Sequence, residues 1–562
     1  MAGPIKALEG GLFPSWERWR AAIKTPGSAI IVVVSPILSA VLTAHTFPPH
    51  DFGWIAWFGL VPFCLMIPGA SWTFERYLGA FIASLAFYGI GPHFIDTFGE
   101  VLSVASPGQF RQLWLAATAL GIWVWPLTSL LARRLHLGCG FPLTASFPIA
   151  WVVVEHSRHW FCLILVGNEC PWLHLGYSQV EFGPILQVAA LGGMGLVSLL
   201  ICSVNAGLAV AVRSLLDRAW PDRREQAGLV FSTLGLLGAV YYGSGQLGPN
   251  ASSVAFRVGL VPRATMIAHA RSEAAILKRD LEAQGFRPNL LLYGENTVEH
   301  VTIPPLQSVI GRASSDQGPW EAILAEVSRE VGIDLVVGTT RTTKTIDGDR
   351  RHVCAVLVDH KAGLVAWSDK SALVPFAESS PAWADHAWVR ALLPVTDKNV
   401  DFTPSRRMGT FTIPVEAPPR AVRLGAAICY DVSSAGLFRD AAPRSDAFLV
   451  LGNEPVDPRR CTPSWLLNMA RCRAVESHRA IARTAIGGTT CMVDRRGRIE
   501  VESPRRSAGP GDSMLVVTLP LSGEITLYHR LGDWPTHLGL ALAAIGPISG
   551  RLGRNATGRF MI

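Results

Sequence analysis

The sequence predicts a multi-span α-helical membrane bundle of about eight spans, with one α/β domain inserted before the last span. The 562 residues are 49% hydrophobic and only 17% charged, whereas a typical soluble protein is about a quarter charged. Long apolar segments dominate the chain before residue 250. Between about 250 and 530, short apolar segments alternate with helix-forming ones, which is typical of a layered α/β domain.

Seven apolar segments come first, and each supplies close to the roughly 20 residues that cross the hydrocarbon core of a bilayer. They lie near residues 28–46, 54–70, 77–95, 112–132, 141–158, 185–212 and 227–245. Pro62 and Pro92 interrupt the second and third, and an eighth segment runs from about 536 to 548. Apolar sequence begins only near Ser28, after several basic residues, so we expect a retained first span rather than a cleaved secretory signal.

Basic residues give the expected orientation. If eight spans alternate, one side receives Arg18, Arg20, Lys24, Arg133, Arg134, Arg213, Arg218, Arg223, Arg224, Arg551, Arg554 and Arg559. An excess of Lys and Arg marks the cytoplasmic side, so the inserted domain is expected outside the cytoplasm. The predicted division is a cytoplasmic segment 1–27, seven spans in 28–249, the inserted domain 250–530, a last span in 531–550 and a cytoplasmic tail 551–562.

The net charge of +7 does not indicate a nucleic-acid binder, because the basic residues lie in short clusters between apolar runs. The ten cysteines show no paired short spacing, so we expect neither a disulfide framework nor a zinc site, and no metal or cofactor. His156, His159 and His174 lie around the loop after the fifth segment without ligand spacing. Glu155 and Glu169 are costly if they face lipid, so they are expected at the interface or inside the bundle.

The inserted domain contains a series of short apolar strand candidates. These are Phe256–Val261, Asn289–Tyr293, Asp334–Gly338, Val353–Val358, Leu364–Trp367, Leu424–Ile428 and Ala447–Leu451. Helices are expected at Ser272–Gln284, Pro319–Val331 and Trp465–Arg479. The Pro- and Arg-rich pieces around 403–420 and 503–511 are interpreted as surface loops.

Three reactive residue types each follow a predicted strand: Glu295, Lys370 and Cys429. Taken singly, each has an ordinary structural interpretation as a turn residue, a strand-end lysine or a small buried filler. Together they form a chemical set. A carboxylate can take the thiol proton, an ammonium lowers the thiol pKa and can hold an oxyanion, and the thiolate can attack an acyl carbon to give a thioester.

The order Glu, Lys, Cys, with Lys370-x-x-Leu-Val-Pro-Phe-x-Glu378 and Ile428-Cys-Tyr-Asp431, resembles the nitrilase, or carbon–nitrogen hydrolase, superfamily. With the membrane segments, the chain resembles the apolipoprotein N-acyltransferase branch of it. Further segments carry the resemblance: Trp151–Glu155, Pro171–Gln179, Gly192–Gly195, Asn205, Met469–Arg479, Arg483, Gly487–Thr490, Tyr528 and Gly532–Pro535.

The resemblance implies a nitrilase-like α-β-β-α sandwich and an acyltransferase with a Glu295-Lys370-Cys429 triad. Cys429 would take an acyl chain from a membrane phospholipid and pass it to the α-amine of a diacylglyceryl-cysteine at an apolipoprotein N-terminus. Lys370 would stabilise both oxyanions, with the Tyr430 backbone N–H as a further candidate donor. Glu378 would be a second essential carboxylate, and Tyr430 and Asp431 would support the site or bind substrate.

The implied setting is the bacterial cytoplasmic (inner) membrane, with the catalytic domain on its periplasmic or outer face. The implied partners are a phospholipid donor and a diacylated lipoprotein acceptor, with no nucleic acid, and the chain is expected to be a monomer. An active site resting on its own spans avoids extracting a lipid, which costs about 0.8 kcal/mol per methylene.

Some segments differ from the family pattern. Tyr293-Gly294 replaces Trp-Pro before the base, Ala377 replaces Gly, Asp431 replaces Glu, and Glu454–Asp457 replaces an Asp-x-Trp-Phe loop; the first strand reads Gly259–Arg263 in place of one with Gln-x-Asn. The triad is unchanged, but the loops expected to contact substrates are altered. Asp431 therefore leaves open a membrane-tethered amidase or nitrilase acting on a small amide or nitrile. A non-catalytic transporter or scaffold is the third hypothesis, which the intact triad disfavours.

Overall fold

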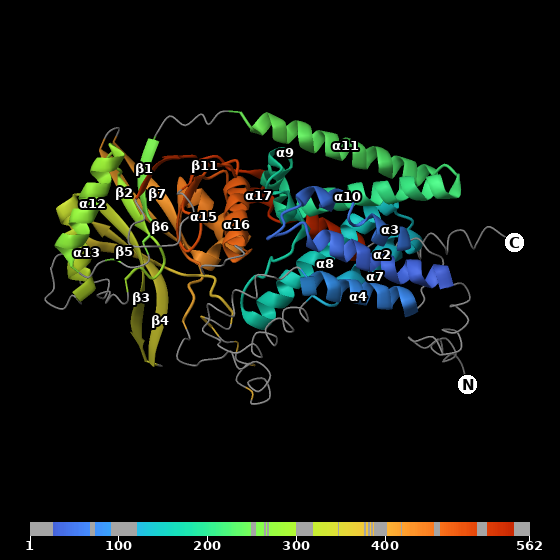
Figure 1. Ribbon diagram of the computed structural model, residues 1–562, viewed down its shortest axis with the longest axis horizontal. Coiled ribbons are helices and arrows are strands. Elements are labelled where there is room, and N and C mark those ends of the chain that lie inside the picture. Colours follow the sequence, from blue (N-terminus) through green and yellow to red (C-terminus); the bar gives the residue numbers. More distant parts are fainter. Residues whose placement is uncertain are drawn as a thin grey trace.

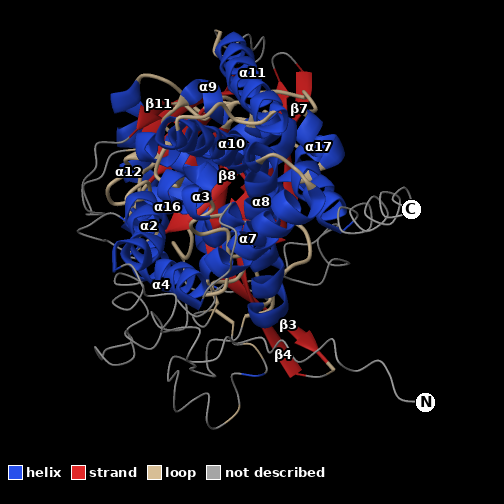
Figure 2. Ribbon diagram, turned by 90° about the vertical axis from the view of Figure 1, so that its right-hand side faces the viewer, coloured by secondary structure: helices blue, strands red, loops and turns tan. Residues whose placement is uncertain are grey.

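The computed structural model divides into a helical part and a part built on two β-sheets, which lie side by side (Figure 1). It describes residues 26–67, 74–90, 121–248, 255–263, 266, 269–298, 319–346, 348–375, 378–379, 381, 383, 386, 402–416, 419–454, 461–502 and 514–544. Seen from the helical end, helices cover most of the sheets, and the long hairpin of β3 (Asp334–Thr345) and β4 (Gly348–Asp359) projects beyond them (Figure 2).

The helical part is formed by helices before residue 248 and by a returning segment, 534–544, that is also helical. The helices are α2 (Pro26–Ala44), η1 (Gly53–Trp57), α3 (Val61–Met66), α4 (Phe74–Ile90), α7 (Val124–Arg133), η2 (Arg134–Gly138), α8 (Leu143–Val166), η3 (Leu175–Gln179), α9 (Gly183–Leu186), α10 (Ala189–Asp217) and α11 (Arg223–Gln246). Among the described residues, α8, α10 and α11 are long and apolar enough to cross a membrane.

The predicted number of spans is not reached by this criterion. Three shorter apolar helices lie in the described chain at Val33–Ala44, Gly53–Met66 and Arg76–Ile90. Parts of the predicted segments 77–95, 112–132 and 536–548 lie outside the described residues. Within the second segment, Pro62 does not interrupt a helix but begins one, α3, because the first turn of a helix does not need the N–H that proline lacks. Eight spans therefore stay a prediction.

The inserted domain contains two six-stranded sheets, ordered β12-β1-β2-β3-β4-β5 and β11-β10-β9-β8-β7-β6. The strands are β1 (Ala255–Val261), β2 (Leu290–Tyr293), β3 (Asp334–Thr345), β4 (Gly348–Asp359), β5 (Gly363–Asp369), β6 (Gly409–Glu416), β7 (Pro419–Ile428), β8 (Ala447–Asn453), β9 (Ile481–Ile486), β10 (Cys491–Val493), β11 (Ile499–Glu502) and β12 (Leu515–Pro520). Helices α12 (Ala270–Gln284) and α13 (Pro319–Val331) cover the outer face, and α15 (Ala435–Ala441) and α16 (Cys461–Ser477) face the helical part (Figure 1). The predicted α-β-β-α sandwich is confirmed.

Parallel pairing at the centre of each sheet explains the apolar strands. Strand β2 pairs in parallel with β1 and β3, and β8 pairs in parallel with β7 and β9. Strands covered on both faces by other layers are apolar throughout, and every residue of Leu290–Tyr293 is buried. The carboxyl ends of parallel neighbours lie at one edge of their sheet, where the residues that follow β2 and β7 are brought close to the opposite sheet.

The prediction of a surface loop at 403–420 is wrong, because Gly409–Glu416 forms β6 and β7 begins at Pro419. Residues alternate across β6, so that Phe411 and Ile413 are buried. Strand β6 is the last strand of its sheet, a position that tolerates the proline within it. The other predicted loop, 503–511, lies outside the described residues.

The two parts of the molecule share one buried hydrophobic cluster. The Trp465 ring of α16 stacks on Phe47 from the helical part, with centroids 5.2 Å apart, and meets Trp172 edge-on at 5.6 Å. Gly193 in α10 has φ +67°, and a Cβ there would lie 2.7 Å from the Tyr528 ring. Glycine therefore lets α10 bend where the returning C-terminal segment crosses it.

Candidate active site

The structure brings Glu295, Lys370 and Glu378 into direct contact. Lys370 Nζ donates to Glu295 Oε1 at 2.8 Å and to Glu378 Oε1 at 2.7 Å. Lys370 is only 1% exposed and Glu295 only 3% exposed. An ammonium in this position is held between two carboxylates, so its direction is fixed by charge-assisted hydrogen bonds.

Glu378 also fixes the segment that follows the lysine. Its Oε2 accepts the Val374 N–H at 2.8 Å, and its own N–H donates to the Val374 carbonyl at 2.9 Å. One carboxylate oxygen thus holds the ammonium while the other closes a turn, which ties the position of Glu378 to that of Lys370.

Cys429 lies at a sharp turn between β7 and the 3₁₀ helix η7 (Cys429–Ser433). Its φ is +46°, in the left-handed region that residues other than glycine rarely adopt. Its Sγ lies 3.7 Å from the carbonyl oxygen of Asn453, which can accept the thiol hydrogen. Backbone strain of this kind is often found where a fold presents a reactive side chain.

Burial and charge set the protonation states of the three central groups. Burial raises the pKa of the Cys429 thiol well above its usual range, with Glu295 adding to the effect and Lys370 opposing it. Burial also raises the pKa of Glu295 to about 7, although Lys370 and a hydrogen bond with Cys429 partly offset it. Burial lowers the pKa of Lys370, but Glu295 and Glu378 outweigh this and hold it well above the ordinary value. The resting state is therefore a neutral thiol, a lysine ammonium and a carboxylate that titrates near neutrality.

Asp431 binds backbone rather than facing the sulfur. Its Oδ1 accepts the N–H groups of Ser371 at 3.0 Å and Ala372 at 2.6 Å, and its Oδ2 accepts the Ile428 N–H at 2.8 Å. Burial raises the pKa of Asp431 to about 6, against the lowering effect of these bonds. The carboxylate joins the chain after Lys370 to the chain before Cys429, so it positions both.

Tyr430 attaches the same turn to the helical part. Its hydroxyl accepts the Trp172 Nε1–H at 2.9 Å and donates to the Glu169 carbonyl at 3.3 Å. The Trp172 and Tyr430 rings stack with centroids 5.9 Å apart. The side chain of Tyr430 is thus occupied by structural contacts.

One buried pair near the site was not singled out from the sequence as functional. Glu454 directly follows β8 and forms an ion pair with Arg483 of β9, and both side chains are almost fully buried. The negative charge of Glu454 also contributes to the raised pKa of the Cys429 thiol. The sequence signals were the charged Glu454 directly after a predicted strand and the place of Arg483 among the residues that carry the family resemblance.

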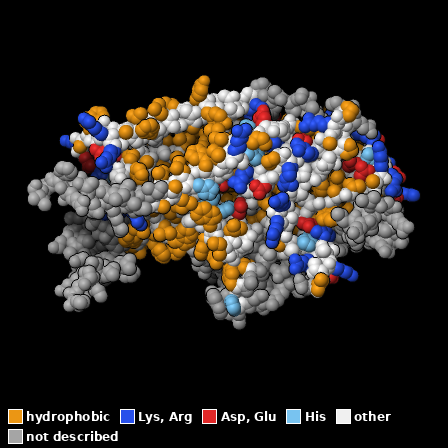
Figure 3. Space-filling model, turned by 180° about the vertical axis from the view of Figure 1, so that it is seen from behind, with side chains coloured by type: hydrophobic (Ala, Val, Ile, Leu, Met, Phe, Trp, Pro, Cys, Tyr) orange, Lys and Arg blue, Asp and Glu red, His pale blue; other side chains and the backbone are white. Residues whose placement is uncertain are grey.

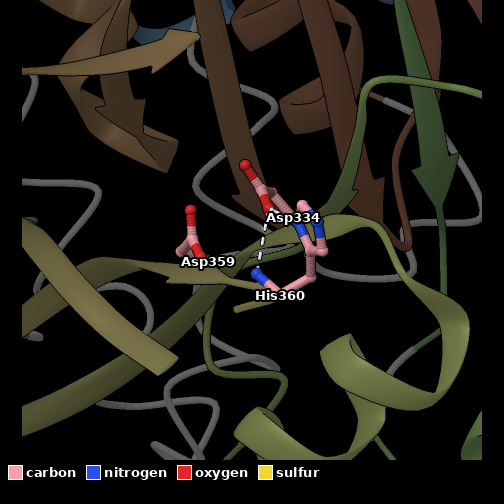
Figure 4. A group of neighbouring side chains, drawn as sticks. All are labelled: Asp334, Asp359 and His360. Atoms are coloured by element: carbon pink, nitrogen blue, oxygen red, sulfur yellow. Dashed lines mark hydrogen bonds and ion pairs between the residues drawn. The ribbon is translucent and has the colours of Figure 1, made fainter. Parts of the chain in front are cut away.

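Away from this site, the described residues contain one group of three ligand-type side chains close enough to hold a metal: Asp334, Asp359 and His360. Asp334 Oδ1 accepts the backbone N–H of His360 at 3.0 Å and lies 2.6 Å from His360 Nδ1. Asp359 instead accepts the N–H groups of Lys361 and Ala362, and no interaction joins it to the other two (Figure 4). These contacts close the turn between β4 and β5.

Comparisons with known proteins cover both parts of the chain. A family model described as Apolipoprotein N-acyltransferase N-terminal domain matches residues 39–207, and one described as Carbon-nitrogen hydrolase matches residues 296–526. The apolipoprotein N-acyltransferase of Geobacter metallireducens is 25% identical over 534 residues, which are 90% of this chain and 94% of that protein. The enzyme of that name from Azotobacter vinelandii is 28% identical over 514 residues, 89% of this chain and 86% of the relative.

Among solved structures, Nit3 of Saccharomyces cerevisiae, a member of branch 10 of the nitrilase superfamily, aligns at 17% identity with a TM-score of 0.34. The alignment covers 48% of this chain and 91% of Nit3. The two family models fall on the helical part and on the two-sheet domain respectively, in the same order as in relatives that match nine-tenths of the chain. The chain belongs to the apolipoprotein N-acyltransferase family of the carbon–nitrogen hydrolase superfamily.

Proposed function

We propose that this protein transfers an acyl chain from a membrane phospholipid, through a thioester on Cys429, to the α-amine of the N-terminal diacylglyceryl-cysteine of apolipoproteins. The observation that carries the proposal is the pair of short contacts that Lys370 Nζ makes with Glu295 and Glu378, beside a strained cysteine turn that is attached to the helical part. Family membership supplies the substrate class.

In the first half-reaction Glu295 takes the thiol proton of Cys429, and the thiolate attacks the ester carbonyl carbon of the phospholipid. Among the described residues, Lys370 Nζ makes two hydrogen bonds, and an ammonium has three N–H groups. The third N–H is the donor for the oxyanion, with the Tyr430 backbone N–H as the second candidate. The oxyanion collapses, the ester C–O bond breaks, and Glu295 returns its proton to the departing lysophospholipid.

In the second half-reaction the neutral α-amine of the lipoprotein attacks the thioester carbonyl carbon. Lys370 again holds the oxyanion, and Glu295 accepts a proton from the attacking nitrogen. The C–S bond then breaks, which forms the amide, and the Cys429 thiolate recovers a proton from Glu295. A carboxyl whose pKa is about 7 suits both transfers, because a group that gives and takes protons works best when its pKa is near the working pH.

We further propose eight spans, with residues 250–530 on the periplasmic or outer face of a bacterial inner membrane and both termini in the cytoplasm, in a monomer that binds no nucleic acid. Helices α8, α10 and α11 support membrane insertion by their length and apolar character. The contact of Tyr430 with Trp172 supports a catalytic turn seated on the membrane part. Glu378, Tyr430 and Asp431 are positioning residues in this proposal.

The alternative of a membrane-tethered hydrolase for small amides rested on Asp431. That carboxylate accepts three backbone N–H groups, so it gives no sign of contact with a small substrate. The geometry therefore offers no separate support for the hydrolase.

The test is incubation with phosphatidylethanolamine that carries a labelled acyl chain. The wild-type protein should acquire a labelled, hydroxylamine-sensitive thioester, and a diacylated lipopeptide should then receive the label as an amide. Cys429→Ser should lose the thioester, whereas Cys139→Ser, at a cysteine outside the site, should retain it. Hydroxylamine-sensitive label on Cys429→Ser, or release of ammonia from small amides without transfer to the lipopeptide, would overturn the proposal.

A further inference from the structure

A polar cavity separate from the candidate active site lies where the helical part meets the two-sheet domain. It has a volume of about 250 Å³ and is lined by residues from α8, the loop after α8, η3, α10, η7, α15, α16 and the segment 533–537. We call it the junction cavity and define it by His159, Glu169, His174, Arg439, Arg473 and Asp533. Glu295, Lys370, Glu378 and Cys429 do not line it, so the proposed reaction leaves it unexplained.

Two side chains of the junction cavity are buried and incompletely paired. His174 is 9% exposed, and its Nε2 has no hydrogen-bond partner among the described residues. Arg473 is fully buried; it donates to the Tyr177 hydroxyl at 2.6 Å and forms an ion pair with Glu476 at 3.1 Å, but its Nε has no hydrogen-bond partner in the described chain. A buried polar atom without a partner is destabilising, so these atoms indicate a polar ligand.

The cavity presents both signs of charge. Guanidinium groups come from Arg439 and Arg473, and carboxylates from Glu155, Glu169, Glu476 and Asp533. His159 Nε2 lies 3.5 Å from Glu169 Oε1. Guanidinium groups match phosphate oxygens in geometry and charge, and carboxylates are the natural partners of an ammonium. A group that carries both a phosphate and an amine would satisfy both sets.

The histidines of the cavity do not gather around a single metal ion. Within the described residues, the one set of three ligand-type side chains with mutually close ligand atoms is the Asp334, Asp359 and His360 turn described above. The lining therefore fits an extended polar group better than an ion.

The walls beside the cavity are apolar and exposed. On α8, Phe161 and Ile164 are 40% and 82% exposed, and in the C-terminal segment, next to the lining residues 533–537, Leu531 and Leu538 are 53% and 51% exposed. On the face shown in Figure 3, histidine and charged side chains gather where the hydrophobic surface of the helical part ends. A polar cavity that lies along residues 152–160 of a membrane-length helix, with exposed apolar side chains nearby, suits an amphiphile with its head inside.

We propose that the junction cavity binds the headgroup of a phospholipid that carries a phosphate and an amine, as in phosphatidylethanolamine, with its acyl chains against α8 and residues 534–544. A volume of about 250 Å³ is below the roughly 300–1,000 Å³ of pockets that enclose whole drug-sized ligands, so it holds a headgroup and not an entire lipid. The lipid is not a substrate, because the residues of the candidate active site lie outside the cavity. The proposal rests on the proposed function only for the membrane setting.

The test uses native mass spectrometry of the full-length protein in detergent with an ether-linked phosphatidylethanolamine, which has no acyl ester to react. The wild-type protein should retain one more lipid than Arg439→Gln at equal lipid concentration, or bind it at least about tenfold more tightly. Arg444→Gln is the matched control, because Arg444 lies five residues further along and outside the cavity. Equal lipid retention in Arg439→Gln and Arg444→Gln would overturn the proposal.

Headgroup chemistry gives the second readout. Asp533→Asn should reduce the preference for phosphatidylethanolamine over phosphatidylglycerol, which has no amine, whereas a structural effect would weaken both equally and overturn the assignment.

Free O-phosphoethanolamine should displace the lipid only at much higher concentration; displacement at equal concentration would show a soluble ligand instead. If a variant does not fold, phosphatidylethanolamine with a photoreactive headgroup should label residues 156–174 or 533–537 of the wild type, and label confined to 370–379 would overturn the proposal.

Acyl-enzyme formation with the ester-linked lipid is measured separately. Arg439→Gln should still form the Cys429 adduct. A protein that retains the extra lipid but forms no adduct would contradict the proposed function and leave the headgroup site standing, so the two failures are distinct.

Discussion

Lys370→Met should slow acylation of Cys429 by about 10²–10³-fold, which is the loss that follows removal of one oxyanion donor. The structure assigns two of the three N–H groups of the ammonium to Glu295, at 2.8 Å, and Glu378, at 2.7 Å. With respect to the described residues, this leaves one N–H for the oxyanion of the proposed mechanism. Methionine has a similar length and fills the same space, so it removes the charge and the donors with little loss of packing.

A second effect follows from the same contacts. Without the ammonium, no cation lies between the carboxyl groups of Glu295 and Glu378. A like charge close to a carboxyl group favours its protonated form. The pKa of Glu295 should rise above its present value of about 7, so less of the base is available at neutral pH. Breaking a buried ion pair typically costs about 3–5 kcal/mol, and uptake of a proton should reduce that cost.

The assay is single-turnover acylation followed by intact-protein mass spectrometry between pH 6 and 9. Lys361→Met is the matched control, because Lys361 is an exposed lysine in the turn between β4 and β5. Raising the pH should recover the part of the loss that comes from protonated Glu295 but not the part that comes from the missing donor. Acylation by Lys370→Met within about threefold of the control at every pH would refute the oxyanion role.

Three further outcomes are expected. In the proposed mechanism Glu295 is the base and its pKa is about 7, so acylation should fall close to tenfold for each pH unit below that value; a rate independent of pH from 5 to 7 would contradict this role. Asp431→Asn leaves one of three backbone N–H groups facing an amide NH₂, so urea unfolding should show a loss of about 1–3 kcal/mol together with a lower kcat; an unchanged midpoint would be inconsistent with these bonds. Tyr430→Phe removes the acceptor of the buried Trp172 N–H and should cost a similar amount, whereas a stability equal to wild type would show that this contact contributes little.

The meeting of Glu295 and Lys370 was predictable because each follows a strand of the same sheet and the motif around each is local. Cys429 follows β7 of the other sheet, and its position at a strand end was predictable because an apolar run ends immediately before it. Sequence patterns of this kind report the end of a strand and the residue type found there. They do not report which backbone groups a side chain binds, so Asp431 left a membrane-tethered amidase or nitrilase open, whereas its carboxylate bridges two segments of the site.

Edge strands and long-range contacts were harder to predict from the sequence. Strand β6 carries Pro414 and borders a basic, proline-rich stretch, so its composition indicates a loop although its alternation buries Phe411 and Ile413. The bond between Trp172 and Tyr430 joins residues 258 positions apart, and no local pattern encodes such a pairing. The number of spans is set by helix ends and by contacts between helices, which hydropathy alone places only approximately.

The loop after α8 connects the helical part with two segments of the candidate site, the one after Lys370 and the one around Cys429. The Asn168 side chain donates to the carbonyl of Leu373, three residues after Lys370, and Trp172 donates to Tyr430, next to Cys429. One short loop therefore contacts both the segment that carries Lys370, the proposed oxyanion donor, and the segment that carries Cys429, the proposed nucleophile. Since the spacing between these groups decides the rate of acyl transfer, the two-sheet domain depends on α8 for its geometry as well as for its location. The candidate site therefore combines contacts inside the two-sheet domain, such as those of Lys370 with Glu295 and Glu378, with contacts to the loop after α8.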